Sequence, residues 1–118
     1  MTMKEFYEKI GGDYGDVVKR FGGEAMAERF GKKFLSDPSF SGLKAAFESG
    51  SCEEAFRAAH TLKGVCQNLG YGDLGSVSSD MTELLRAGGF DEAKAMYGAV
   101  EAEYGKLTAL IKECFGVQ

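Results

Sequence analysis

Histidine and cysteine are scarce in this chain, and their spacing excludes several kinds of site. The 118 residues include one histidine and three cysteines. The cysteines, at positions 52, 66 and 114, lie far apart and form no CxxC pair. A structural zinc site takes four such ligands, usually from closely spaced pairs, so we expect no metal site. An odd number of cysteines without an export signal predicts reduced thiols and a cytoplasmic protein.

Positive charge and long apolar runs are also lacking. The chain carries 14 basic and 18 acidic residues, a net charge of −4. Nucleic-acid binding requires a basic face, so this balance argues against it. No apolar run approaches the roughly 20 residues of a membrane-spanning helix, and the N-terminal residues lack the apolar segment of a secretory signal. We therefore expect neither a nucleic acid nor a membrane as partner.

The strict alternation of apolar and polar residues that marks β-strands is absent too. Apolar residues recur every three or four positions, and glycine, serine or proline interrupts them. The helices predicted by this pattern cover residues 3–10, 14–35, 39–49, 51–69, 73–87 and 91–115. Gly22 and Gly23 either bend or divide the second of these.

Short connections force neighbouring helices to run antiparallel. We therefore predict a single all-α domain over residues 1–118, an antiparallel up-down four-helix bundle that begins near residue 14. The short N-terminal helix is expected to cover one end of it. Ser51, followed by Glu54, is the capping-box pattern of a helix start, and Gly70 is expected to end that helix. Asp73 is expected to cap the next helix.

The single histidine, His60, is predicted to face solvent. At about 100° per residue, the apolar residues around it gather in one arc about 120° wide, the side of a helix that packs on a core. These residues are Ala55, Ala58, Ala59, Leu62, Val65, Cys66 and Leu69. His60 lies about 160° from the middle of that arc, so its imidazole points away from the core.

Gly64 is an unusual residue for this outer face. Inside a helix, glycine costs about 1 kcal/mol relative to alanine, and core packing cannot explain it on a solvent-facing side. A bare backbone beside the imidazole would, however, let another protein approach closely.

The residues around His60 resemble a known family. The segment His60-Thr61-Leu62-Lys63-Gly64, followed by Asn68-Leu69-Gly70, is similar to the signature of histidine-containing phosphotransfer (HPt) domains of bacterial phosphorelays. The resemblance extends to residues 20–23, 34–38 and 84–88 and so covers most of the chain.

The resemblance implies a function for particular residues. His60 corresponds to the phosphoryl acceptor, and Lys63 and Gly64 match supporting positions. The implied partners are receiver domains of hybrid histidine kinases and of response regulators. No cofactor is implied for this chain, and Mg²⁺ is expected only on the partner receiver. We expect the protein to be a monomer.

Phosphoryl transfer requires an accessible imidazole and stabilisation of the charge on three oxygens. Lys63, three residues after His60, can place its ammonium group beside the phosphoryl group. Gln67, two turns along, is placed to donate a hydrogen bond at the rim. If the next helix is antiparallel about Tyr71, Thr82 lies level with His60 and Ser78 lies one turn away. These two hydroxyls are candidates to orient the imidazole.

Phe56 and Arg57 precede His60 and are candidates for a docking surface. An exposed aromatic residue suits docking, although Phe56 is equally able to pack between two helices. Arg57 is either part of that surface or an ordinary solvated charge.

Three functions are compatible with these residues. The first is a phosphorelay carrier without kinase activity of its own, since the chain has no glycine-rich phosphate loop and no room for an ATP-binding domain. The second is the phosphoryl-acceptor module of a chemotaxis-type kinase. The third is a helical adaptor that binds receiver or kinase domains without being phosphorylated. The carrier is favoured because an adaptor would not need the imidazole.

Overall fold

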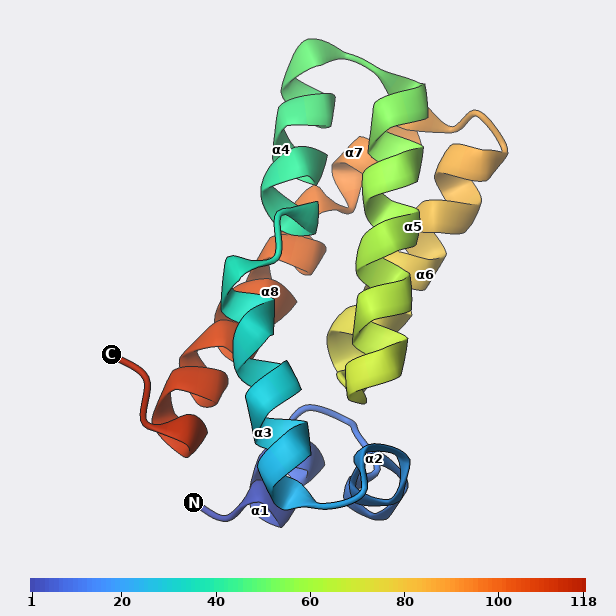
Figure 1. Ribbon diagram of the computed structural model, residues 1–118. Coiled ribbons are helices and arrows are strands. Elements are labelled where there is room, and N and C mark those ends of the chain that lie inside the picture. The colour runs from blue at the N-terminus through green and yellow to red at the C-terminus, as the bar shows by residue number, and fades with distance from the viewer.

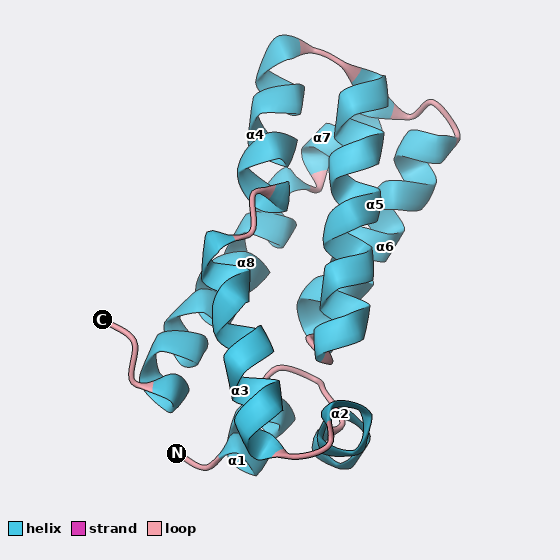
Figure 2. Ribbon diagram, viewed as in Figure 1, coloured by secondary structure: helices cyan, strands magenta, loops and turns pink.

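Every regular element of the computed structural model, which describes residues 1–118, is helical (Figures 1 and 2). In chain order the elements are α1 (Met3–Lys9), α2 (Tyr14–Phe21), α3 (Glu24–Lys33), the 3₁₀ helix η1 (Phe34–Ser36), α4 (Ser39–Ser49), α5 (Cys52–Leu69), α6 (Gly72–Arg86), α7 (Phe90–Ala95) and α8 (Tyr97–Phe115). The prediction of an all-α protein is confirmed. None of these helices combines the length and the apolar composition that crossing a membrane requires.

The helices form a bundle with a helical cover at one end (Figure 1). α5 packs between α4 and α6, and α8 packs against α6 and α3. α3 and α4 follow one another along the same side, so that together they take the place of one long helix (Figure 1). α1 and α2 lie at the lower end of the bundle in this view. The apolar residues of α1 and of the turn that follows it, Met3, Phe6, Tyr7 and Ile10, are buried.

The segment predicted over residues 14–35 is divided into two helices by its glycine pair. Gly22 ends α2 with a φ of 78°, and Gly23 precedes α3 with a φ of 144°. Residues with a side chain rarely adopt such φ values, because their Cβ atom would come too close to the backbone. The chain therefore turns at this pair and starts a new helix.

α5 begins and ends near the predicted residues. The Ser51 hydroxyl accepts a hydrogen bond from the Glu54 backbone N–H at 3.1 Å. The Ser51 N–H itself donates to the Ala46 carbonyl at 3.0 Å, which closes the end of α4. Only half of the predicted capping box therefore forms, because its second donor is already used. Gly70 ends α5 in the left-handed conformation, as predicted.

Asp73 does not cap α6, contrary to the prediction. The helix begins at Gly72, so Asp73 lies within its first turn. The Asp73 backbone N–H instead donates to the Ile10 carbonyl at 2.9 Å. The first backbone N–H groups of a helix have no partner within the helix. At Asp73 the end of α1, rather than a side-chain cap, supplies that partner.

The last helix was predicted to be continuous over residues 91–115, and this is wrong. α7 ends at Ala95 and α8 begins at Tyr97, with Met96 at φ −84° and ψ −8° between them. On the α7 side the Phe90 ring contacts the Phe47 ring at 5.4 Å. On the α8 side Tyr97 stacks on Phe40 at 5.8 Å and packs edge-on against Phe47 at 6.1 Å. The break at Met96 therefore accompanies packing of both helices on the aromatic side chains of α4.

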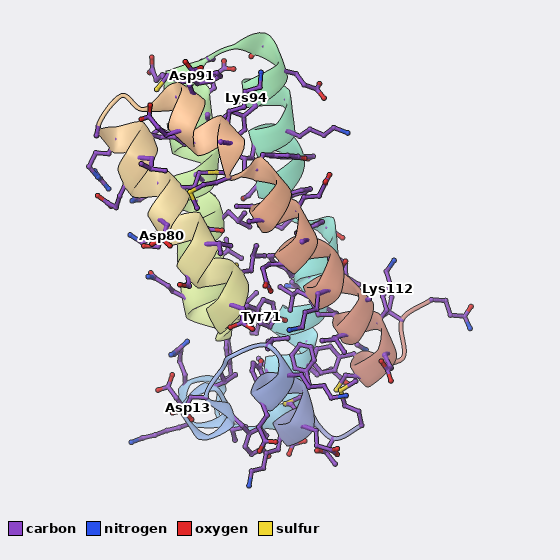
Figure 3. All side chains as sticks on the ribbon, turned by 180° about the vertical axis from the view of Figure 1, so that it is seen from behind. Asp13, Tyr71, Asp80, Asp91, Lys94 and Lys112 are labelled. Atoms are coloured by element: carbon purple, nitrogen blue, oxygen red, sulfur yellow. The ribbon has the colours of Figure 1, made fainter.

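Tyr71 joins the N-terminal cover to the bundle. Figure 3 shows it at the level where the cover meets the end of the bundle. Its ring packs edge-on against Phe6 at 6.0 Å and against Phe34 at 5.3 Å. The neighbouring Tyr7 hydroxyl donates a hydrogen bond to the Leu69 carbonyl at 3.1 Å. These contacts hold the C-terminal end of α5 against the cover.

Gly31, Gly98 and Gly105 lie inside helices, and the structure explains the first of them. A Cβ atom on Gly31 would lie 2.7 Å from the Tyr71 hydroxyl oxygen and 3.2 Å from the Phe115 ring. Gly31 is therefore required where α3 packs closely on the core. A Cβ atom on Gly98 or Gly105 would meet no atom within 4 Å, and nothing in the structure explains these two glycines.

Alanine substitutions at Gly31 and Gly105 are expected to have opposite effects on stability. Gly105→Ala should raise the free energy of unfolding by about 1 kcal/mol, because it restores helix propensity at an open position. Gly31→Ala should lower it by about 1–3 kcal/mol, because the methyl group overpacks the core. Urea unfolding followed by circular dichroism measures both variants. Equal effects of the same sign would contradict this account of the interior glycines.

Candidate functional site

His60 lies on the solvent-exposed side of α5, as its sequence pattern predicts. The opposite side of the helix is buried at Ala55, Ala59, Leu62, Cys66 and Leu69. Ala58 and Val65 are half-buried at the edges of this face. The imidazole takes part in no ion pair, and no hydrogen bond within the chain involves it. Its accessible face is therefore open to an incoming group.

Lys63, Gly64 and Gln67 share the outer face of α5 with His60. Gly64 and Gln67 are exposed and Lys63 is half-buried. A Cβ atom on Gly64 would meet no atom within 4 Å, so the backbone beside the imidazole is uncovered. Lys63 forms no ion pair within the chain, and its ammonium group is therefore not neutralised by a carboxylate.

Phe56 and Arg57 lie differently from one another. The half-buried Phe56 ring has its centroid 5.8 Å from that of the His60 ring, with 34° between the ring planes. The Arg57 side chain is 72% exposed and pairs with Glu53 at 3.1 Å. Phe56 thus borders the imidazole directly, whereas Arg57 is a solvated residue whose charge a neighbouring carboxylate offsets.

Arg86 is a neighbour of the site that was not predicted from the sequence. Its guanidinium carbon lies 5.0 Å from the centroid of the Phe56 ring, in a cation–π contact. The antiparallel register that places Thr82 level with His60 also places Arg86 level with Phe56. That register, together with the resemblance over residues 84–88, was the signal that could have identified Arg86.

Ser78 and Thr82 are not brought to the imidazole, so the prediction that they orient it is contradicted. Both residues are completely buried. The Thr82 hydroxyl donates to the Ser78 carbonyl at 2.6 Å, and the Ser78 hydroxyl has no hydrogen-bond partner. The prediction that Thr82 lies level with His60 used only the position of the turn near Tyr71. It did not consider which side of α6 carries these residues, and that side faces the core.

A hollow of about 430 Å³ lies between α2 and the adjoining ends of α5 and α6. Its lining includes Gln67 and Arg20, but not His60. The Arg20 guanidinium donates to the Gln67 carbonyl at 3.0 Å and also to the Asn68 carbonyl. These bonds satisfy the last carbonyls of α5, and the same guanidinium pairs with Asp16 on its own helix. Arg20 therefore fixes the end of α5, while His60 lies on an open face outside this hollow.

None of the three cysteines forms a disulfide. Burial raises the pKa of the Cys66 thiol to about 12, so it stays protonated at neutral pH and acts as a small apolar core residue. No group of three or more histidine, cysteine, aspartate or glutamate side chains is arranged to hold a metal ion.

Comparison with known families agrees with this arrangement. The Hpt domain matches residues 36–110, which include α4, α5, α6 and α7 and most of α8. The chain belongs to the Hpt family. Hpt domains act in histidine phosphotransfer within phosphorelays, interact with receiver domains, and form a phosphocarrier family whose members are typically not catalytic kinases. No curated protein and no solved structure matches the chain.

Proposed function

We propose that this Hpt protein is a phosphorelay intermediate that accepts a phosphoryl group on His60. The donor is the phosphorylated aspartate of a receiver domain, and the next acceptor is the aspartate of a response regulator. The observation that carries the proposal is the position of the single histidine: it is exposed on α5, within the family-matched segment, and next to an uncovered glycine.

The geometry suits direct transfer between two proteins. The lone pair of an unprotonated imidazole nitrogen attacks phosphorus, and an N–P bond forms. The P–O bond to the receiver's aspartate breaks, and that carboxylate leaves with the electron pair. The transition state is loose and spreads charge over three oxygens, so catalysis consists mainly of positioning and charge stabilisation.

Lys63 is the cation on this face that no carboxylate offsets, and we assign to it the stabilisation of the phosphoryl oxygens. A lysine ammonium is a compact point charge on a flexible stem, so it can follow the phosphoryl group from donor to acceptor. Gly64 leaves space for the receiver surface that carries the aspartate. Gln67 lies farther along the same face, at the edge of the proposed contact.

Incubation with a radiolabelled, phosphorylated receiver domain tests the proposal. Transfer of acid-labile label to this protein, followed by its loss to a second receiver, is the expected result. Binding of the receiver without transfer would instead favour the adaptor function. Labelling only by a kinase domain with ATP would favour the acceptor module of a chemotaxis-type kinase. Both of these outcomes would overturn the carrier proposal.

The partners follow from the same experiment done with a panel of receivers. We propose that these are receiver domains of hybrid histidine kinases and of response regulators. We also propose that the protein is a monomer and that the transfer takes place in the cytoplasm. The fastest transfer at equal receiver concentration identifies the cognate pair. Comparison of the forward and reverse rates for that pair gives the direction of net phosphate flow.

A further inference from the structure

Phe56 is the aromatic neighbour of the His60 imidazole. It lies four residues earlier on α5, so the two side chains are adjacent on the same side of the helix. Their ring centroids are 5.8 Å apart and their planes are tilted by 34°. Phe56 is half-buried and also packs against the hydrophobic core. One ring therefore contacts both the core and the imidazole.

Arg86 holds the Phe56 ring from the neighbouring helix. The guanidinium group, from the last residue of α6, lies over the ring at 5.0 Å. Its Nε atom is 3.3 Å from a carboxylate oxygen of Glu83, one turn earlier on α6. Arg86 therefore pairs with a carboxylate on its own helix while it covers a ring on α5. This contact restricts the positions that the Phe56 ring can adopt.

The imidazole has no polar partner that could orient it. Ser78 and Thr82 on the facing helix are buried, and the Thr82 hydroxyl donates to a backbone carbonyl. No side chain of that helix forms a hydrogen bond with the imidazole. An exposed histidine without neighbours would exchange among the staggered rotamers of its first side-chain torsion. The adjacent phenyl ring occupies part of that space and excludes some of these orientations.

We infer that Phe56, held in place by Arg86, positions the imidazole of His60 by ring contact in place of a hydrogen bond. Both are positioning residues, because Arg86 acts through Phe56 and Phe56 acts through the imidazole. The consequence for transfer rests on the proposed function: fewer imidazole orientations leave a larger share of molecules with the reactive nitrogen directed at the incoming phosphorus.

Phe56→Leu removes the ring but keeps a large apolar side chain, whereas Phe56→Tyr keeps the ring. In proton NMR, an aromatic ring shifts the signals of nearby protons, so the His60 imidazole signals report the contact without any phosphorylation. They should move in Phe56→Leu and in Arg86→Gln and stay nearly unchanged in Phe56→Tyr. Phe40→Leu is the matched control, since Phe40 is a half-buried aromatic residue that stacks on Tyr104 in α8.

The rate of labelling by phosphoramidate measures how the orientation of the imidazole affects phosphoryl transfer. This small donor needs no docking surface. Phe56→Leu should slow it by on the order of three- to tenfold, less than the roughly 100-fold loss that a displacement of 1 Å can cause. Phe56→Tyr and Phe40→Leu should label at close to the wild-type rate.

Unchanged imidazole signals and unchanged labelling in Phe56→Leu would overturn the inference. Slower labelling in Arg86→Gln with unmoved imidazole signals would also overturn it, because Arg86 would then act on the phosphoryl group directly. If the wild-type protein takes no label from any donor, the proposed function fails, while the imidazole signals of Arg86→Gln, which keeps the ring, still report whether Arg86 holds the ring beside the imidazole.

Discussion

A His60→Gln variant is expected to take up no acid-labile phosphate, either from a phosphorylated receiver or from phosphoramidate. Glutamine has no imidazole nitrogen that can form the N–P bond, and the chain contains no second histidine. The free energy of unfolding should change by less than about 0.5 kcal/mol, because His60 is exposed and forms no hydrogen bond within the chain. Radiolabelling with acid and alkali treatment, alongside urea unfolding, measures both quantities.

Glu101→Gln is the control for this experiment, since Glu101 is an exposed residue on α8 rather than on this face of α5. It should label at a rate within a few-fold of wild type. Acid-labile label retained in His60→Gln would rule out His60 as the acceptor. A loss of several kcal/mol in the free energy of unfolding would show that the histidine contributes to the core instead.

Gly64→Gln is expected to slow transfer from a phosphorylated receiver at least about tenfold, with the thermal midpoint little changed. A long side chain would stand one turn from the imidazole, where a Cβ atom now meets nothing within 4 Å. A partner would then be held away from His60, and misplacing reacting groups by about 1 Å can cost on the order of 100-fold in rate. Labelling by phosphoramidate should fall much less, because that donor needs no docking surface.

Two controls separate an effect of the substitution on docking from an effect on helix stability. Gly105→Gln makes the same change at another exposed helix position with open space, on α8 rather than α5, and should leave both labelling rates unchanged. Gly64→Ala should stabilise the free protein by up to about 1 kcal/mol through helix propensity. If Gly64→Gln slows both donors equally, Gly64 affects the imidazole itself. If it slows neither, the docking face lies elsewhere.

The local features of α5 followed directly from its sequence. The period of about 3.6 residues determines which side chains share a face, so the exposure of His60 and Gly64 and the burial of Leu62 were correctly predicted. The ends of the helix were also determined locally. Ser51 supplies a hydroxyl for the first backbone donors, and Gly70 adopts the left-handed conformation that ends a helix.

The contacts between helices were decided only by the tertiary structure. Periodicity reports which side of a helix faces the core, but not how far the neighbouring helix is rotated or shifted. Ser78 and Thr82 are for this reason buried, and Arg86 rather than either hydroxyl reaches the Phe56 ring that borders the imidazole. The hydrogen bond from Asp73 to Ile10 and the break at Met96 likewise depend on residues distant in sequence.

The sequence by itself therefore determined which residue we propose as the acceptor and the open face around it, because both depend on spacing within one helix. The tertiary structure decided what surrounds that face. Phe56 borders His60 through its place on the same helix, but only the packing of α6 against α5 brings Arg86 over the Phe56 ring. Such a contact depends on the relative position of two helices, and a helical repeat contains no information about that position.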